Sequence, residues 1–160
     1  MARCASIRLI SHRSGALALR WGLGPGWMPV GALQQLQALL DDHSFWAQGR
    51  SRADLRTMLR HSAAVVSVWR GQRLVGFGRA SSDGLFRAVL WDVVVAAEYQ
   101  GQGLGRRIVT ALLEHPRLSA VERTYLMTSN SAGFYAQLGF ATVQGQKLML
   151  RRPGGHHDQL

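Results

Sequence analysis

Hydrophobic side chains change their spacing partway along the chain. Between residues 30 and 42 leucines recur three or four positions apart, which is the repeat of an amphipathic helix. A second helical stripe follows Ser51, which forms a capping pattern with Asp54. From residue 63 onward, short runs of β-branched and aromatic residues are separated by glycine-containing turns. These runs predict strands at residues 63–69, 74–80, 86–95 and 124–128.

The second half of the chain alternates strands with helices. A glycine-rich loop at residues 100–105 precedes another helical stripe, with leucine and isoleucine on one side. Residues 131–138 predict a short helix, and residues 140–143 and 147–150 predict a final hairpin. The order predicts an α/β (α+β) domain with helices first, then an antiparallel meander, then a parallel crossover.

The length of 160 residues suits one domain with its own hydrophobic core. We expect this domain to span residues 17–150, with a loose N-terminal segment at residues 1–16 and a loose tail at residues 151–160. Residues 7–10 are apolar enough to form a first strand instead. The lone Cys4 excludes an internal disulfide and a paired-cysteine zinc site. No apolar run reaches the roughly 18–20 residues that cross a bilayer.

Basic residues outnumber acidic ones, with 19 lysines and arginines against 9 aspartates and glutamates and a formal charge of +10. This excess favours an anionic partner, such as nucleic acid, acidic lipid headgroups or a phosphorylated small molecule. Residues 1–20 lack acidic side chains, as organelle transit peptides do. We expect a cytoplasmic protein of bacterial or cyanobacterial type, with plastid targeting as the alternative. The six histidines are scattered along the chain, so no catalytic metal is expected.

Gln100, Gly103 and Gly105 form a Q-x-x-G-x-G pattern between a predicted strand and a predicted helix. Glycine lets the backbone approach a ligand closely. The N-terminus of the following helix directs free N–H groups and a partial positive charge at the loop. Arg106 and Arg107 come next and are suited to further phosphate charge. The loop therefore predicts a pyrophosphate-binding site, with a tight turn that binds nothing as the alternative.

Three motifs in register give the sequence a resemblance to a known family. The loop at residues 100–105 follows the strand sequence LWDVVV, and residues 133–140 read GFYAQLGF. Together these motifs resemble the acetyl-CoA-binding core of the GNAT N-acetyltransferase superfamily, closest to its plant-plastid and cyanobacterial branch of serotonin (arylalkylamine) N-acetyltransferases. The resemblance covers roughly residues 64–150. It implies the GNAT fold, a mixed and mostly antiparallel sheet flanked by helices, with a parallel splayed strand pair at the cofactor site.

The resemblance also implies where acetyl-CoA binds as co-substrate. The backbone at the end of the central strand would pair with the pantetheine arm, and the loop amides would hold the pyrophosphate. Many relatives carry Asn or Asp where this chain has Thr128, so either the Thr128 hydroxyl or Asn130 is the substitute contact for pantetheine. The implied cofactor-binding residues are Val93, Val94, Val95, Gln100, Gly101, Gln102, Gly103, Leu104, Gly105, Arg106 and Asn130.

For the chemistry, the resemblance implies a general acid at Tyr135, within reach of the thioester sulfur. The base is inferred from burial, because Asp92 is a carboxylate in an otherwise apolar strand and an unpaired buried charge is costly. We expect Asp92 to act as the base or to anchor the amine, with a structural ion pair to an arginine as the alternative. Glu98 is the second candidate base. Strand alternation places Trp91 and Asp92 on opposite faces of the sheet.

The combined prediction is an N-acetyltransferase that moves acetyl from acetyl-CoA to a primary amine by direct attack in a ternary complex. The amine belongs to an arylalkylamine such as serotonin, or to a protein N-terminus or lysine. Two alternatives stay open: a basic nucleic-acid-binding module, and a GNAT domain that binds acetyl-CoA without turnover. We expect no nucleic-acid partner, no membrane partner and no metal, and a homodimer is an open option.

Overall fold

The computed structural model describes residues 6–12 and 31–153 of the chain. It divides into two compact units, Met1–Thr128 and Ser129–Leu160. The first unit holds one five-stranded sheet in the order β1-β2-β3-β4-β5. Its strands are β1 (Ile7–His12), β2 (Ala64–Arg70), β3 (Arg73–Ser82), β4 (Arg87–Val95) and β5 (Arg123–Tyr125). Its helices are α2 (Ala32–His43), α3 (Arg52–Arg60), the 3-10 turn η1 (Ala97–Tyr99) and α4 (Leu104–Leu113).

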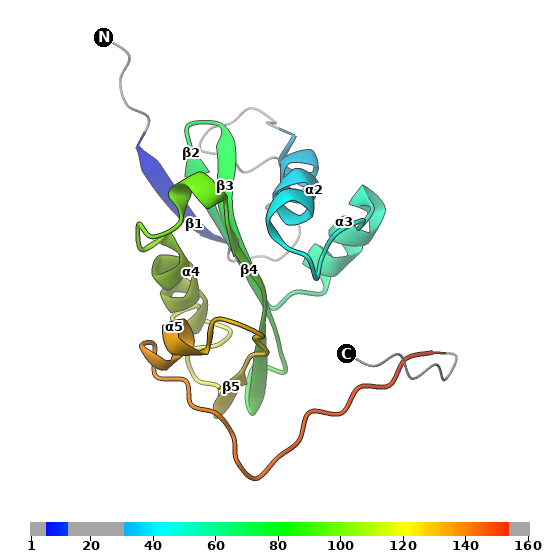
Figure 1. The fold of residues 1–160 in the computed structure, drawn as a ribbon, viewed down its shortest axis with the longest axis vertical. Coiled ribbons are helices and arrows are strands. Elements are labelled where there is room, and N and C mark those ends of the chain that lie inside the picture. Colours follow the sequence, from blue (N-terminus) through cyan, green and yellow to red (C-terminus); the bar gives the residue numbers. More distant parts are fainter. Residues whose placement is uncertain (1–5, 13–30, 154–160) are drawn as a thin grey trace. The chain divides into compact units, whose positions relative to one another are not determined.

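The sheet is antiparallel from β1 to β4 and parallel between β4 and β5. Helix α4 covers one face of the sheet, while α2 lies on the other and contacts α3 (Figure 1). Every residue of β2 except the last is buried, because helices cover both faces of this central part. This mixed α/β arrangement confirms the predicted fold class. β1 confirms the alternative prediction of a strand at residues 7–10, and the prediction of one domain over residues 17–150 stays a prediction.

Two glycines of β3 let α4 lie close to the sheet. A Cβ at Gly78 would stand 2.5 Å from the Ile108 side chain and 3.2 Å from that of Leu112. A Cβ at Gly76 would stand 3.0 Å from Ile108. The contact at Gly78 is shorter than carbon atoms tolerate and the one at Gly76 is tight, so a larger residue at Gly78 would require Ile108 or its helix to shift. The position of α4, and of the loop that leads into it, therefore depends on these glycines.

β4 carries a bulge at Asp92. Phe77 of β3 pairs with Val94 of β4, and Arg79 pairs with Trp91. The two pairs are two residues apart on β3 and three residues apart on β4. The extra β4 residue is accommodated at Asp92, whose φ of 52° is the only positive φ of a non-glycine residue in the part of the chain that the structure describes. Aspartate tolerates this left-handed conformation better than most residues. The bulge bends β4 just before its last three residues.

β4 and β5 separate soon after they meet. They pair in parallel only at Arg87–Val89 of β4, and β5 ends at Tyr125. Within the described ranges no strand pairs with Leu90–Val95 on that edge of β4, although β3 pairs along the opposite edge. This confirms the splayed parallel strand pair that the family resemblance implies. The strand at residues 124–128 is shorter and less buried than predicted, because the chain turns away from β4 after Tyr125.

The second unit contains the short helix α5 (Ala132–Ala136). Gly139 follows it with a φ of 86°, as suits a residue that ends a helix. The hairpin predicted at residues 140–143 and 147–150 is wrong: the described residues 140–150 form no strand. Their apolar side chains include Leu148 and Met149, which are 78% and 90% exposed. A hairpin without a packed face is marginal in water, so alternation alone does not produce one here.

Candidate functional site

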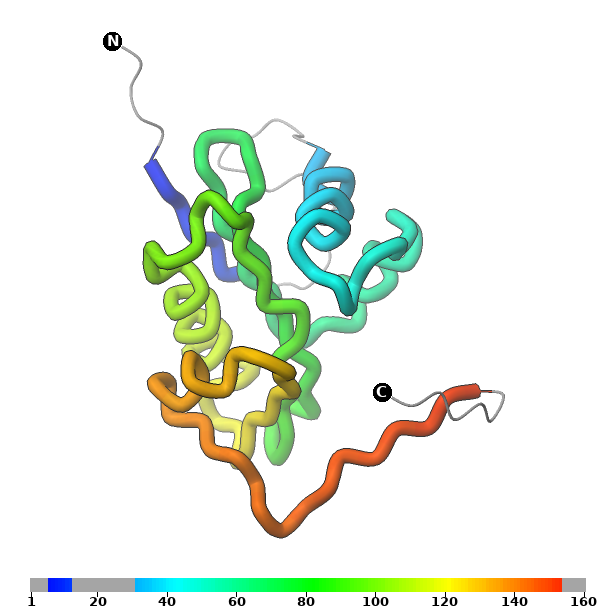
Figure 2. Tube along the Cα trace, viewed as in Figure 1, coloured from blue at the N-terminus to red at the C-terminus, as the bar shows by residue number. Residues whose placement is uncertain are grey.

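A glycine loop connects the end of β4 to the start of α4. The chain leaves Val95, passes through η1 and enters α4 at Leu104 (Figure 2). Gly101 and Gly103 have φ values of 73° and 77°, the left-handed region that glycine adopts without strain. A Cβ at either position would meet no atom within 4 Å, so the space beside the loop backbone is open. Both glycines are exposed.

The backbone amides of residues 101–105 have no acceptor among the described residues. For the N–H groups of residues 101–105, no hydrogen bond to any described residue is present, and no side chain caps α4. The first helical bond is donated by Arg107 N to Gly103 O at 3.1 Å. Free N–H groups at the N-terminus of a ten-residue helix form a site for an anion. The structure thus leaves the amides of residues 101–105 available to a ligand, whereas the Gln100 amide donates to Ala97 O at 3.2 Å.

The two glutamines of the motif hold the loop in place. Gln100 Nε2 donates to Val95 O at 3.0 Å, and Gln102 Nε2 donates to Glu98 O at 3.0 Å. The side chains of Gln100 and Gln102 therefore bind the protein's own backbone. A ligand contact from either glutamine side chain would require these bonds to break.

Tyr99 anchors the turn before the loop. Its side chain is buried, its hydroxyl accepts a bond from Arg70 Nη1 at 3.0 Å, and the Arg70 and Arg73 guanidiniums lie 5.6 and 5.9 Å from its ring centroid. Arg73 also pairs with Glu98. The sequence prediction missed Tyr99 and both arginines, and the one available signal was an aromatic residue directly before the motif.

Glu98 is poorly suited to be the base. Its own backbone N–H, and then the Arg73 side chain, hold the pKa of the Glu98 carboxyl below its ordinary value. Both interactions favour the ionised form, which makes the carboxylate a weaker proton acceptor. Glu98 stays a second candidate only.

Val93, Val94 and Val95 form the end of β4, where only one backbone edge is paired in the described chain. Val94 is buried and its two neighbours are half-buried, so the side chains pack while the backbone edge toward β5 has no ladder partner in the described chain. On the other edge, Phe77 and Gly76 pair with Val94 and Val95. An extended ligand could add to this edge as a strand does.

Asp92 lies in an ion cluster on the same strand. Its side chain is 3% exposed, and its Oδ2 accepts from Arg50 Nη1 at 2.9 Å and from Arg79 Nε at 2.7 Å. Arg50 comes from the segment between α2 and α3, where Gln37 Nε2 donates to its carbonyl at 2.9 Å. An ion pair with an arginine, the alternative to a catalytic role for Asp92, is therefore present. Arg50 was not predicted, and a separation of 42 positions leaves no sequence signal for it.

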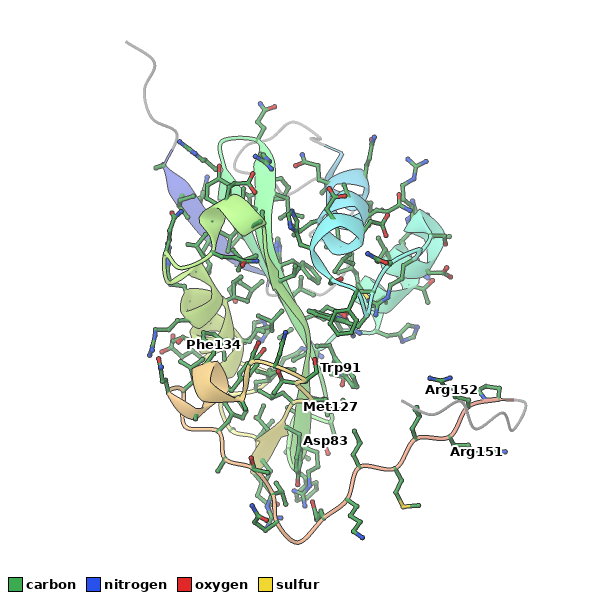
Figure 3. The ribbon with its side chains drawn as sticks, viewed as in Figure 1. Asp83, Trp91, Met127, Phe134, Arg151 and Arg152 are labelled. Carbon is green, nitrogen blue, oxygen red and sulfur yellow. The ribbon has the colours of Figure 1, made fainter. Side chains whose placement is uncertain are left out.

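Trp91 and Asp92 do not lie on opposite faces of the sheet, and this prediction is wrong. The Arg79 guanidinium bonds Asp92 and also lies 5.8 Å from the centroid of the Trp91 ring. The bulge is the reason, because an extra residue interrupts the alternation of side chains along β4. Trp91 Nε1 also donates to Ser81 Oγ at 2.8 Å. Figure 3 labels Trp91 beside β4.

Tyr135 lies on α5 in the second unit. Its ring contacts Phe134 and Phe140 edge-on, with centroid distances of 4.9 and 5.9 Å. Burial raises the pKa of its phenol above the ordinary value of 10.0, so the hydroxyl is protonated at neutral pH. A protonated phenol is the form that a general acid requires. In the same unit, Asn130 Oδ1 accepts a bond from Ser131 Oγ at 3.1 Å.

Among the described residues, no three histidine, cysteine, aspartate or glutamate side chains gather as metal ligands would. No helix in that part of the chain has the length and apolar character needed to span a bilayer.

Known proteins resemble the chain in sequence and in structure. The model of the acetyltransferase (GNAT) family matches residues 33–140. An uncharacterised N-acetyltransferase of Porphyra purpurea is 34% identical over 113 residues, covering 68% of this chain and 64% of that protein. Serotonin N-acetyltransferase 2, chloroplastic, of Oryza sativa subsp. japonica is 42% identical over 98 residues, covering 58% of this chain and 48% of that protein.

Among solved structures, a Xanthomonas campestris pv. campestris protein assigned to the GNAT acetyltransferases has a TM-score of 0.70 and 27% identity. The match covers 91% of this chain and 93% of that one. The chain spans about a third to two thirds of the length of the curated relatives it matches.

Proposed function

The chain belongs to the GNAT acetyltransferase family, and from this premise we propose that it transfers an acetyl group from acetyl-CoA to a primary amine. One observation carries the proposal: in the described part of the chain, a row of loop amides without acceptors adjoins a strand edge without a partner strand. The first feature suits a pyrophosphate and the second suits an extended amide chain. Acetyl-CoA contains both groups.

The described residues of the first unit fit acetyl-CoA. The amides of residues 101–105 would hold its pyrophosphate, and the open space at Gly101 and Gly103 admits phosphate oxygens close to the backbone. Arg106, exposed in the first turn of α4, would add positive charge. The backbone of Val93, Val94 and Val95 would bind the pantetheine arm. Asn130 is proposed as a further pantetheine contact.

When bound, acetyl-CoA supplies an acetyl thioester as the acyl donor. A backbone N–H at the end of β4 would donate to the carbonyl oxygen, where negative charge develops. Tyr135 would donate its phenolic proton to the departing sulfur, and its raised pKa keeps that proton in place at neutral pH. The amine attacks directly, so the chain needs no nucleophile of its own.

A protonated amine must lose a proton before it attacks, and Asp92 is the proposed proton acceptor or amine anchor. Its two guanidinium contacts support the competing role, a structural ion pair, because protonation of Asp92 would leave two positive charges without a counterion. Glu98 is the remaining candidate base. Substitution of Asp92 separates these roles, as argued in the Discussion.

The acceptor class is proposed from the relatives. The rice protein is named a serotonin N-acetyltransferase, which supports an arylalkylamine as the first class to test. A protein N-terminus or a lysine side chain is the other proposed acceptor. Three relatives are named chloroplastic, and residues 1–20 lack acidic side chains, so a plastid location is a proposal beside the cytoplasmic one. Association into a homodimer also stays a proposal.

Thiol release from acetyl-CoA tests the activity. The full chain is incubated with acetyl-CoA and, in turn, serotonin, tryptamine, a peptide with a free N-terminus and a peptide with an internal lysine. We expect thiol release that depends on the amine, with the acetylated product identified by its mass.

Thermal stability measured with acetyl-CoA and with an oligonucleotide distinguishes the alternatives. Stabilisation by acetyl-CoA without turnover on any amine would indicate a domain that binds acetyl-CoA and does not catalyse transfer. Stabilisation by the oligonucleotide alone, decreasing steeply with salt, would overturn the proposal in favour of nucleic-acid binding.

A further inference from the structure

The ion cluster at the β4 bulge contains more positive than negative charge. Arg50 and Arg79 share a single carboxylate, that of Asp92, and both bonds end on the same oxygen, Oδ2. No second carboxylate forms an ion pair with either arginine within the described ranges. The cluster therefore has a formal charge of plus one in a partly buried place, where water screens charge less well.

Both guanidiniums retain donors that Asp92 does not use. Each guanidinium carries five N–H groups, and the cluster uses Nη1 of Arg50 and Nε of Arg79. Arg50 Nη1 also approaches the Met58 sulfur at 3.5 Å, which is a weak acceptor. The side chains of Arg50 and Arg79 are 31% and 16% exposed, whereas that of Asp92 is 3% exposed. Solvent, or a ligand, thus reaches the arginines and hardly reaches the carboxylate.

The cluster lies next to the proposed acyl-transfer segment. Asp92 directly precedes Val93–Val95, whose backbone is proposed to hold the thioester arm. Arg50 reaches the cluster from the segment between α2 and α3, on the face of the sheet opposite α4 (Figure 1). Trp91 stands against Arg79 and limits where that guanidinium can move. The spare donors therefore lie beside the strand whose last three residues are proposed to hold the thioester arm.

A net positive charge there repels an ammonium group and attracts an anion. The planar guanidinium fork matches the two oxygens of a carboxylate or a phosphate. Resting on the proposed function, we propose that Arg50 and Arg79 bind an anionic group of the acceptor. The preferred acceptors are then amines that also carry a carboxylate or a phosphate, and arylalkylamines without an anionic group, such as tryptamine, are poorer ones.

Matched pairs of acceptors test this proposal. Tryptophan and tryptamine share a ring and an amine and differ by the carboxylate, and O-phosphoethanolamine and ethanolamine differ by the phosphate. In at least one of the two pairs, we expect kcat/KM to be about 10- to 100-fold higher for the anionic amine than for its partner. This is the range typical of one hydrogen bond between charged groups. The pair with the larger ratio identifies the anion.

Variants assign the effect to the cluster. Arg50→Gln is expected to reduce the preference about tenfold, and Arg50→Lys to restore part of it. Because the ratio is compared between variants, the intrinsic reactivity of each amine cancels. Arg56→Gln is the matched control: Arg56 is exposed on α3 and the net charge changes equally, so the preference should not change. Thermal unfolding of each variant checks that the fold is kept.

Kinetic and binding outcomes decide the proposal separately. Equal kcat/KM within both pairs, or a preference that Arg50→Gln and Arg56→Gln reduce equally, overturns the proposal. If no amine is acetylated, the proposed function fails separately, and calorimetric binding of N-acetyltryptophan against N-acetyltryptamine still decides the anion site. Tighter binding of the acid, lost in Arg50→Gln, would support the site without catalysis, and equal binding would exclude it.

Discussion

Asp92 combines an unusual backbone conformation with a buried ion pair. Its φ of 52° suits few side chains, and its carboxylate is the single counterion of two arginines. Sequence reasoning recognised the residue, since a carboxylate among valines needs a partner. It did not identify the partners, because Arg50 and Arg79 approach from other elements. The role of Asp92 in proton transfer stays a prediction.

Asp92→Asn tests which role dominates. Asparagine tolerates the same φ, so the substitution removes the charge and leaves the bulge. We expect the free energy of unfolding, measured by urea denaturation, to decrease by about 3 kcal/mol, because two guanidiniums lose their counterion in a partly buried place. Glu122→Gln, which removes exposed ion pairs to Arg87 and Arg123, should cost less than about 1 kcal/mol.

The pH profile of kcat completes this test. Loss of the acid limb in Asp92→Asn, with stability near wild type, would identify a base. Unchanged stability together with an unchanged profile would contradict both roles.

Tyr135→Phe tests the proposed general acid. Removal of the phenolic proton should lower kcat by roughly 10²–10⁴-fold with little change in KM for acetyl-CoA, since packing against Phe134 and Phe140 is kept. Burial raises the pKa of Tyr135 above 10.0, so loss of its proton should reduce wild-type activity only above pH 10. Tyr125→Phe makes the same change on β5 and should leave kcat near wild type. Wild-type turnover in Tyr135→Phe would remove this residue from the mechanism.

At the scale of elements, local patterns predicted which segments are helices and strands, and tertiary contacts set where they end. The stripe near residues 30–42 became α2, and Ser51 caps α3 by accepting from Asp54 N at 3.1 Å, as the capping pattern predicts. The run at residues 86–95 became β4, but its bulge has no local signal. β5 ends at Tyr125 although the apolar run continues, since nothing pairs with the later residues in the described chain.

The loop before α4 is the element on which the proposed cofactor site depends, and Gly103→Ala tests it. Alanine at a φ of 77° costs about 1 kcal/mol of stability, and its methyl group would project into the open space beside the loop. We expect a several-fold higher KM for acetyl-CoA with kcat largely kept. Gly84→Ala is the matched control, because Gly84 has a φ of 80° and open surroundings at the turn between β3 and β4.

These two alanine variants should lose similar stability in thermal unfolding and differ in KM. An equal KM in Gly103→Ala and Gly84→Ala would mean that the loop does not bind the pyrophosphate.

At the scale of the whole molecule, a buried polar network joins segments that are far apart in sequence. His12 Nε2 lies 2.8 Å from Ser67 Oγ, which also accepts from Trp69 Nε1 at 2.8 Å. His115 Nε2 lies 3.0 Å from the carbonyl oxygen of His12. The Nδ1 atom of His12 is buried without a hydrogen-bond partner in the structure as described. Protonation of His12 would therefore place an uncompensated charge between β1, β2 and the end of α4.

Stability should decrease in mild acid because of this histidine. Burial, and then the nearby His115, lower the pKa of His12 from 6.5 to about 4. The unfolded chain then binds more protons than the folded chain between these values, so its stability is fully present above pH 6.5 and falls as the pH approaches 4. The free energy of unfolding should decrease by up to about 1.4 kcal/mol per pH unit in this window.

Urea denaturation between pH 7 and 4.5 measures this slope. His12→Gln should flatten it, whereas His61→Gln, at the exposed end of α3, should leave it unchanged. An identical slope in both variants would show that His12 does not titrate on unfolding.

The sequence by itself determined most of the helices and strands and the type of turn before α4. Periodicity predicted α2, α3, β2, β3, β4 and α4, and glycines before a helix predicted an anion-binding turn, because these features depend on neighbouring residues alone. Only the tertiary structure decided that Arg50 and Arg79 meet at Asp92, that β4 bulges there, and that β5 leaves its edge open. These features result from packing between segments that are distant in sequence, so the pattern of neighbouring residues does not predict them.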